Sequence, residues 1–400
     1  MRILQTANDL AHWFRPGVEV FVAGCLGESE LFIEWLKARP DLADGVRFTG
    51  ILIPGVNRFD YASLHPEARL RTIFASPDWR TPARHECLPL GYRDAYAWLS
   101  QQHFDVVLVQ GAPDSHGLSL SVAADFTPAA LKHAGAVLVH RNGFLPITDA
   151  PKIRAPDGRT DCDLPLPSYD AGAVNDSAKK TALNIARLIE PASTLQLGLG
   201  KMQSALLETL PPGRDLRLHS GMVSTPLVNA IGRGVFSSAR DALTCGVALG
   251  DARLLALSDR LRFRSVDHTH DPRTLAAISR FVSINSVLEV DLYGQANAEY
   301  LDGAAISGCG GLVDFVRGAR LSGGTSILAL NATAAGGTHS RIVPRLSGPT
   351  VSVSRHDVDV VVTEFGIARL TGTTGNERAE RLIAIAAPHH QAALREAWRR

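Results

Sequence analysis

Residues 283–324 read SINSVLEVDLYGQANAEYLDGAAISGCGGLVDFVRGARLSGG. Residues 307–311 of this stretch contain three glycines, directly before the apolar run 312–316. Glycines at this density allow positive φ angles and let a ligand approach the main chain closely. Successive N–H groups in such a loop suit a phosphate, a carboxylate or a developing oxyanion. A tight turn between two buried strands has the same pattern, so the stretch predicts either a ligand-binding loop or a turn.

Strand-like and helix-like segments alternate on both sides of this stretch. Short β-type runs followed by amphipathic segments are typical of parallel sheets with helical crossovers, which bind ligands beyond the carboxyl ends of their strands. We therefore predict an α/β fold with mostly parallel sheets flanked by helices. The expected strands are 18–22, 46–53, 70–74, 105–110, 136–140, 195–197, 216–219, 282–286, 326–330, 350–354 and 358–363, and the expected helices are 31–37, 127–133, 176–190, 202–210 and 377–385.

The alternation breaks between residues 148 and 176. Four prolines and many aspartates lie there without clear periodicity, as is typical of a linker or a surface arm. We predict an N-terminal α/β domain, residues 1–173, that ends in this Pro/Asp-rich linker. A second α/β domain is expected to comprise residues 174–400.

Composition excludes several classes of protein. The 400 residues are 45% apolar and 20% charged with a formal net charge of +1, so neither nucleic acid nor an anionic membrane is expected as a partner. No apolar run is long enough to span a membrane, and the N-terminal residues do not resemble a signal peptide. Five scattered cysteines without a CxxC pattern predict reduced thiols in a cytoplasmic protein with no metal site.

Common catalytic and nucleotide-binding motifs are absent. Neither GxxxxGK[ST] nor GxSxG occurs, which argues against a phosphate loop and against an α/β-type serine hydrolase. Gly198-Leu199-Gly200 follows a predicted strand and precedes a predicted helix, but it lacks the remaining residues of a dinucleotide fingerprint.

Several histidines and carboxylates remain as isolated candidates. His268, His270 and the pair 389–390 have no further metal-ligating residues near them in the sequence at the spacing of a zinc site. We therefore expect them to be surface histidines. His116, in a glycine-bounded loop, is expected either to line a cleft or to stabilise its loop. Glu289 and Glu364 lie on strand-like runs, where an internal salt bridge is commoner than a catalytic role.

Several of these segments, taken together, resemble one known family. ISGCGGLVDFVRGA (306–319), VVTEFGIARLTG (361–372), ERAERLIAIAAP (377–388), LVQGAPDSHG (108–117) and LQLGLGKMQSALLETL (195–210) are similar to segments of the acetyl-CoA hydrolase/transferase family, which includes 4-hydroxybutyrate and acetate CoA-transferases. The resemblance implies two CoA-transferase-type domains that hold an acyl-CoA between them. It also implies coenzyme A as substrate or ligand, small carboxylic acids as partners, no metal or redox cofactor, and a homo-oligomer.

The resemblance also implies a site. In the family a glutamate attacks the thioester to give an acyl anhydride and then a glutamyl-CoA thioester, while backbone amides of two glycine loops hold the oxyanion. On this sequence the implied CoA-binding residues are Gly198, Gly200, Ser307, Gly308, Gly310, Gly311 and Asn331. The implied catalytic positions are Leu199, His219, Ser220 and Gly221, of which Gly221 takes the place of the glutamate.

That last position departs from the family pattern. The family segment reads approximately DLGIHSEMxSDG, whereas residues 215–226 read DLRLHSGMVSTP. A glycine has no side chain with which to form a glutamyl thioester, so ordinary CoA transfer is not expected. We favour a diverged acyl-CoA hydrolase, decarboxylase or C–C cleaving enzyme. The alternatives are a CoA-transferase with a substitute nucleophile (another carboxylate, or Cys309, which is expected rather to be a packing residue) and a non-catalytic acyl-CoA-binding protein.

Overall fold

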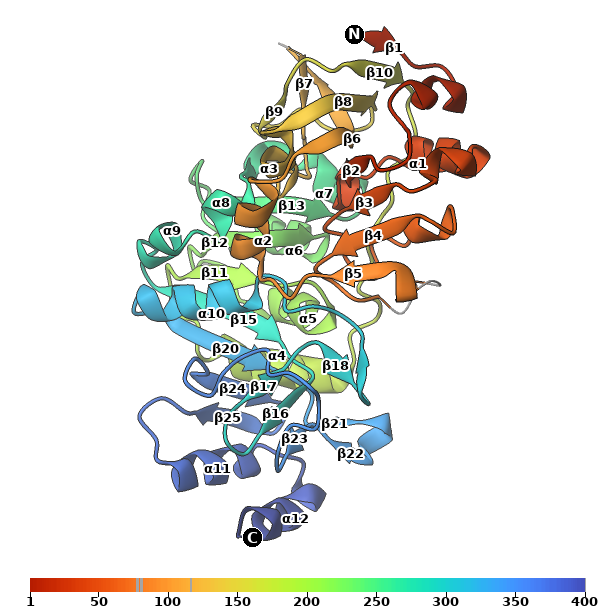
Figure 1. Ribbon diagram of the computed structural model, residues 1–400. Helices are drawn as coiled ribbons and strands as arrows, with labels where there is room; N and C mark the ends of the chain where they lie inside the picture. The colour runs from red at the N-terminus through yellow and green to blue at the C-terminus, as the bar shows by residue number, and fades with distance from the viewer. Residues whose placement is uncertain (77–78, 80–81, 116, 400) are drawn as a thin grey trace. The chain divides into compact units, whose positions relative to one another are not determined.

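The structure is a computed structural model that describes residues 1–400 except 77–78, 80–81, 116 and 400 (Figure 1). The chain divides into two compact units. Unit 1 comprises residues 1–169 and 244–269, and unit 2 comprises residues 170–243 and 270–400. The expected division at residue 173 remains a prediction about which parts of the chain fold on their own. No helix within the described residues is long and apolar enough to cross a membrane.

Unit 1 is built on a parallel sheet, as the alternation of its segments predicts (Figure 1). In spatial order its strands are β1 (Arg2–Ile3), β10 (Gly158–Asp161), β8 (Ala134–Arg141), β6 (Phe104–Asp114), β2 (Glu19–Val22), β3 (Arg47–Thr49), β4 (Arg69–Thr72) and β5 (His85–Cys87). The antiparallel strands β7 (Gly117–Ser119) and β9 (Lys152–Ile153) extend from β6. The helices are α1 (Glu30–Ala38), α2 (Tyr92–Leu99) and α3 (Thr127–Leu131), with 3-10 turns at Ala7–His12, Cys25–Gly27, Pro40–Ala43, Tyr61–Ser63 and Pro82–Arg84.

The interpretation of residues 148–176 as a linker is wrong for part of its length. β10 pairs in parallel with β8 on one side and with β1 on the other. A glycine suits position 158 because a Cβ atom there would lie only 2.9 Å from the side chains of both Leu138 and Trp13, which is too close for any other residue without a shift. The four prolines of this segment lie outside the paired residues of β10. The proline-rich composition therefore gave no sign of a strand that joins β8 to β1.

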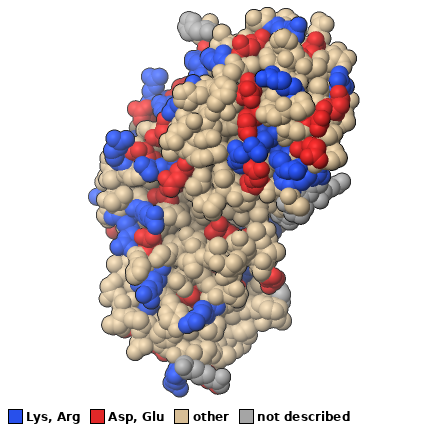
Figure 2. Space-filling view, viewed as in Figure 1, with Lys and Arg blue, Asp and Glu red and all other residues tan. Residues whose placement is uncertain are grey.

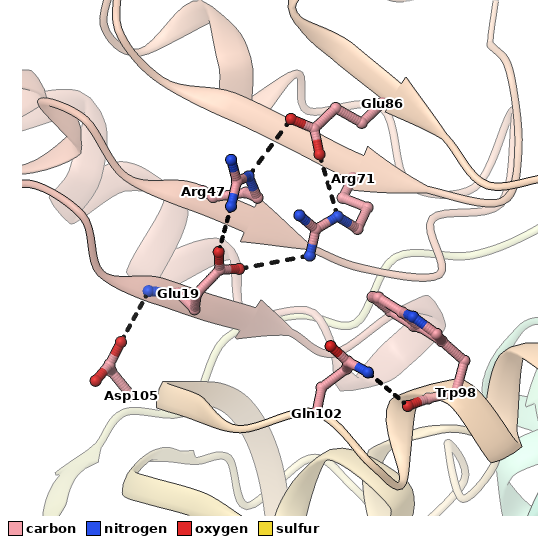
Figure 3. Close-up of polar contacts among 7 residues, drawn as sticks. All are labelled: Glu19, Arg47, Arg71, Glu86, Trp98, Gln102 and Asp105. Atoms are coloured by element: carbon pink, nitrogen blue, oxygen red, sulfur yellow. Dashed lines mark hydrogen bonds and ion pairs between the residues drawn. The ribbon is translucent and has the colours of Figure 1, made fainter.

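Charged side chains form a ladder across four neighbouring strands of this sheet (Figure 3). Glu19 on β2 accepts from Arg47 on β3 at 2.5 Å and lies 3.6 Å from Arg71 on β4. Glu86 on β5 contacts both arginines, at 3.4 and 3.1 Å. The carboxylates on the two outer strands thus each contact both guanidinium groups on the two inner strands, and these contacts support the register of the short parallel strands.

Unit 1 also contains the later segment 244–269. It contributes most of β13 (Leu243–Leu249), β14 (Arg262–Phe263), α7 (Ala252–Ala256), α8 (Val266–Thr269) and a 3-10 turn at Ser258–Arg260. Hydrogen bonds connect it to residues 122–125: Ala124 N–H donates to Gly246 O and Ala248 N–H donates to Val122 O, both at 3.0 Å. These bonds hold the segment to the loop that follows β7.

Unit 2 has a second parallel sheet, which confirms the predicted α/β class. Its strands lie in the order β12 (Arg217–Ser224), β11 (Thr194–Leu197), β15 (Phe281–Ser286), β20 (Thr325–Ala329), β24 (Val360–Thr363) and β25 (Gly366–Arg369), the last being antiparallel. Its helices are α4 (Asp176–Ala186), α5 (Lys201–Thr209), α6 (Pro226–Gly232), α9 (Pro272–Ala276), α10 (Leu312–Leu321), α11 (Gly375–Ala384) and α12 (Pro388–Arg399). The short strands β16 (Glu289–Asp291), β17 (Ala296–Asn297), β18 (Tyr300–Leu301), β19 (Ala304–Ala305), β21 (Thr333–Ala334), β22 (His339–Ser340) and β23 (Ile342–Val343), with a 3-10 turn at Ala335–Gly337, form smaller ladders.

Three expectations for unit 2 need correction. The apolar run 312–316 begins helix α10, so the glycine loop does not lie between two strands. Residues 350–354 form no strand, because only Val353 bridges to Ala296. The expected helix 377–385, which is α11, is not the last one: α12 begins at Pro388, where a proline is tolerated because the first position of a helix needs no N–H partner.

Acidic and basic side chains are interspersed on the face of the molecule shown in Figure 2. This distribution agrees with the near-neutral formal charge of +1.

Candidate functional site

The glycine segments lie near the carboxyl edge of the unit 2 sheet, where parallel strands place their ligands. Gly198, Leu199 and Gly200 follow β11, and Asn331 comes two residues after β20. His219, Ser220 and Gly221 are part of β12 itself. The loop from Ser307 to Gly311 leads directly into α10.

Gln203 connects the first glycine turn to the next strand. Gly200 has a φ of +120°, which only glycine adopts without strain. Cβ atoms placed on Gly198 and Gly200 would lie 3.3 Å from the Gln203 side chain. Gln203 in turn donates to Ser286 Oγ at 3.0 Å, at the end of β15. Gln203 was not predicted from the sequence, where its only signal is a polar residue in the first turn of α5.

The second glycine loop contains two different kinds of glycine. Gly310 has a φ of +55° and therefore needs glycine for its backbone conformation. Gly311 has a φ of −87°, which any residue can adopt. A Cβ atom on Gly311 would nevertheless lie 2.3 Å from His270 Nε2. The side chain of His270, rather than the backbone, thus excludes a larger residue at position 311.

His270 also reaches the position expected for the nucleophile. A Cβ atom on Gly221 would lie 3.1 Å from His270 Cε1. The imidazole packs on Phe315 of α10, with 4.4 Å between ring centroids. The expectation of a surface histidine is therefore wrong for His270, which is 1% exposed, whereas His268 is exposed.

Burial keeps the His270 imidazole neutral. Desolvation, with a smaller contribution from nearby His219, lowers the pKa of His270 from its ordinary value of 6.5 to about 3. At neutral pH the ring carries no charge. It acts here as an uncharged group between two glycine backbones.

His219 and Ser220 are both buried in β12. The Ser220 hydroxyl lies 2.6 Å from Leu197 O and 3.0 Å from Met222 O, so its single proton is shared between two backbone carbonyls. The bond to Leu197 O ties β12 to β11. His219 faces the ring of Phe281 edge-on at 6.4 Å.

The remaining predicted site residues lie in other local contacts. Asn331 Oδ1 accepts from Ser177 Oγ at 3.2 Å, and Ser307 Oγ lies 3.4 Å from Gly308 O. Leu199 and Cys309 are half-buried. The structure therefore groups Gly221 and Gly311 around His270, and Gly198 and Gly200 around Gln203.

Glu289 and Glu364 accept hydrogen bonds rather than forming the salt bridges that were expected. Glu289 accepts from Asn297 Nδ2 at 3.3 Å, and Glu364 accepts from the backbone N–H of Ala332 at 2.8 Å. Within the described part of the chain, no group of three or more His, Cys, Asp or Glu residues could hold a metal ion. His116 lies outside the described residues.

Unit 1 contains a cavity of about 680 Å³ at the start of α1. Its wall includes Glu28, whose carboxylate accepts from Asn57 Nδ2 at 2.8 Å and from the Tyr61 hydroxyl at 3.1 Å. Burial outweighs these two hydrogen bonds and raises the pKa of Glu28 to about 7. Cys25, in the same wall, has a positive φ of 51° and a thiol whose pKa burial raises well above its ordinary value.

Comparison with known proteins identifies the family. Residues 252–398 match the family model of the acetyl-CoA hydrolase/transferase C-terminal domain. The 4-hydroxybutyrate coenzyme A transferase of Clostridium kluyveri is 35% identical over 411 residues, which cover 98% of this chain and 96% of that protein. The chain belongs to the acetyl-CoA hydrolase/transferase family. This family member is an acyl-CoA-processing enzyme, so the resemblance inferred from the motifs is confirmed.

Two further proteins extend the comparison for this acetyl-CoA hydrolase/transferase family member. The succinyl-CoA:cyclohexane-1-carboxylate CoA transferase of Geobacter metallireducens is 37% identical over 303 residues, covering 72% of this chain and 69% of that protein. The crystal structure of 4-hydroxybutyrate CoA-transferase from Porphyromonas gingivalis has a TM-score of 0.83 at 28% identity, covering 100% of this chain and 97% of that one. This similarity confirms the CoA-transferase-type α/β fold.

Proposed function

We propose that this enzyme cleaves an acyl-CoA thioester by transferring the acyl group to water, with no covalent intermediate at position 221. One observation carries the proposal. Gly221 offers no side chain to attack a thioester carbonyl, and the His270 ring lies 3.1 Å from the place where a Cβ atom of residue 221 would be. An acyl acceptor other than residue 221 is then required, and water is the simplest.

The glycine loop supplies the electrostatic part of this reaction. When water adds to the thioester carbonyl, negative charge develops on the carbonyl oxygen. Backbone N–H groups of Gly308, Gly310 and Gly311, in the loop that leads into α10, are suited to donate hydrogen bonds to that oxygen, and the helix N-terminus favours its negative charge. The C–S bond then breaks, the acyl group leaves as a carboxylate, and the CoA thiolate takes up a proton.

The proposed ligand is an acyl-CoA with a small acyl group. Gly198, Gly200, Ser307 and Asn331 are proposed to contact the CoA portion, since the family resemblance implies that these positions bind CoA. Leu199 is proposed to lie beside the thioester. Coenzyme A enters as part of the substrate, and no resident cofactor takes part in these steps.

Transfer to a carboxylate is the second candidate, favoured by the names of the relatives. The two curated relatives described above, 35% and 37% identical, are both CoA-transferases. Transfer here would need a substitute nucleophile, for example Cys309, or direct attack by the accepting carboxylate. Cys309 Sγ lies 3.8 Å from Gly310 O inside the glycine loop, so its position is compatible with this route.

A single isotope experiment separates these routes. The purified protein is incubated in H₂¹⁸O with acetyl-, butyryl-, 3-oxoacyl- and dicarboxylic acyl-CoAs, with and without ¹³C-acetate, and the products are resolved by mass. Hydrolysis predicts free CoA and a carboxylic acid carrying one ¹⁸O atom. Labelled acetyl-CoA would instead establish transfer. A shortened acyl-CoA would indicate C–C cleavage, and the absence of turnover together with CoA-dependent stabilisation would favour a binding protein.

A further inference from the structure

The strongest unassigned feature is the His270 side chain, which fills the centre of the proposed site in unit 2. The ring touches the two glycine backbones from one side and the ring of Phe315 from the other. A second aromatic ring, Phe281, continues this packing, with its centroid 6.5 Å from that of Phe315. An imidazole is thus held inside an apolar pocket between β12 and the loop that precedes α10.

Neither glycine next to the ring is required by its own backbone. Gly221 and Gly311 are not among the glycines with positive φ, in contrast to Gly200 and Gly310. An alanine would therefore be acceptable to the main chain at both positions. The imidazole is the nearest obstacle at both positions: it would lie 2.3 Å from a Cβ atom on Gly311, where Phe315 Cε2 follows at 3.2 Å, and 3.1 Å from a Cβ atom on Gly221.

We infer that His270 is a positioning residue that holds the proposed centre in a carboxylate-free form. Its ring lies 2.3 Å from the Cβ position of residue 311 and 3.1 Å from that of residue 221, so a side chain at 311 would overlap the ring and one at 221 would meet it in tight contact. This inference rests on the proposed function only where it concerns acyl-CoA chemistry. The packing relation among His270, Gly221 and Gly311 stands independently of it.

The chemistry of the pocket agrees with this role. A carboxylate placed beside the buried, uncharged imidazole and Phe315 would lose its hydration without gaining a cationic partner. The tight contact with the ring and the loss of hydration together therefore disfavour a glutamate at position 221. Removing the ring opens the space and lets solvent reach it.

A double-mutant cycle tests the packing relation. His270→Asn removes Cε1 and Nε2, the ring atoms nearest to the two glycines, and keeps a planar polar group. Gly311→Ala in the wild-type background should lower the Tm by about 5 °C or more, because steric overlap in a core costs stability. Gly221→Ala should lower it less, since its contact is longer. In the H270N background both alanine substitutions should lower the Tm by less than half as much.

Gly232→Ala is the matched control for this cycle. Gly232 ends helix α6, has no atom within 4 Å of its Cβ position, and is not among the positive-φ glycines. Its substitution should have the same small effect with and without H270N. Equal losses of Tm for G311A in the two backgrounds would overturn the inference, because distant independent sites add.

A chemical readout tests whether the ring excludes a carboxylate nucleophile. Gly221→Glu and the double variant G221E/H270N are incubated with acetyl-CoA and examined by intact mass. In the double variant the introduced carboxylate attacks the thioester carbonyl, the C–S bond breaks, and an acyl anhydride and CoA thiolate form. The thiolate then attacks the carbonyl of the introduced residue, releases acetate, and leaves CoA joined to the protein as a thioester.

The expected result is a mass gain of one CoA less one water in G221E/H270N and no gain in G221E or in the control G232E/H270N. No adduct in the folded double variant would overturn the statement that His270 keeps carboxylate chemistry out. A wild-type protein that neither binds nor cleaves any acyl-CoA would refute the proposed function. In that case the Tm cycle would still decide the packing relation.

Discussion

Glu28 is an ionisable side chain whose protonation depends on its cavity. Both carboxylate oxygens accept hydrogen bonds, yet its pKa rises from 4.5 to about 7 because burial disfavours the charged form. Between these two values the native protein holds a proton that the unfolded chain has released. The contribution of Glu28 to the free energy of unfolding is therefore fully present below about pH 4.5. It decreases as the pH rises and is lost once the pH has passed about 7.

Glu28→Gln should remove this pH dependence. A glutamine can still accept from Asn57 and needs no proton, so the Tm difference between E28Q and wild type should grow from pH 5 to pH 8 in favour of E28Q. The pKa shift of Glu28 corresponds to at most ~3 kcal/mol of unfolding free energy. The effect is smaller here because the Glu28 side chain is partly open to solvent. Thermal melts in a constant-ionic-strength buffer series measure the difference.

Asp125→Asn provides the control for this pH series. Burial raises the pKa of Asp125 to about 6, so its contribution changes in the same direction over a lower pH range. Superimposable Tm profiles of E28Q and wild type from pH 5 to pH 8 would contradict the role assigned to Glu28.

The sequence predicted the residues of the glycine loops but not what surrounds them. Glycine spacing identified Gly198, Gly200, Gly310 and Gly311, because positive φ and close approach are local requirements. Nothing local distinguishes His270 from His268, although one is buried and the other exposed. Burial is decided by which elements pack together, so the contact of His270 with Gly221 could not be predicted from spacing.

At the scale of elements, one arginine of α11 contacts three separate segments of the chain. Arg378 donates to Arg355 O at 2.7 Å, to Leu370 O at 3.1 Å and to Tyr293 O at 3.5 Å. Desolvation and the nearby Arg355 lower the pKa of Arg378, but three carbonyl acceptors compensate for its partial burial. The guanidinium thus caps backbone groups from three separate segments.

Arg378→Met should destabilise the protein by about 3 kcal/mol, because three carbonyls lose a charged donor while the apolar stem is retained. Urea denaturation with fixed m-values measures the change. Arg381→Met is the matched control on the same helix: Arg381 is exposed and donates to Arg369 O alone. Equal losses for the two variants would show that the three-carbonyl contact contributes nothing specific.

Helix α10 shows why the segment after the second glycine loop could not be assigned from its first residues alone. The run 312–316 alone suits a buried strand as well as a helix. Its buried residues Leu312, Phe315, Val316 and Ala319 are spaced i, i+3, i+4 and i+7, a helical pattern visible only when the segment is followed to its end. Strand β10 escaped prediction for a different reason, since only its pairing with β1 and β8 makes it a strand.

At the scale of the whole molecule, the chain leaves unit 1 at residue 169 and returns to it for residues 244–269. The returning segment is an integral part of unit 1. Val247 bridges to Ala123, Val266 N–H donates to Asp125 O at 3.1 Å, and Phe263 N–H donates to Asp149 Oδ1 at 2.9 Å. The side chains of Val247, Phe263 and Val266 are at most 1% exposed. The sequence contained no signal for this return, because hydrophobic periodicity does not report which unit a segment joins.

A fragment ending at residue 173 should therefore fold poorly. It lacks partners for the backbone of residues 122–125 and loses several fully buried side chains, each contributing about 1.5–3 kcal/mol, against a total stability of roughly 5–15 kcal/mol. Residues 1–169 joined to 244–269 by a flexible Gly/Ser linker of about 15 residues should instead unfold cooperatively. Circular dichroism melts and amide hydrogen exchange of the two fragments measure this difference. A cooperative transition of fragment 1–173 at the temperature of the linked fragment would show that the returning segment adds nothing to unit 1, and the division at residue 173 would then describe how the chain folds.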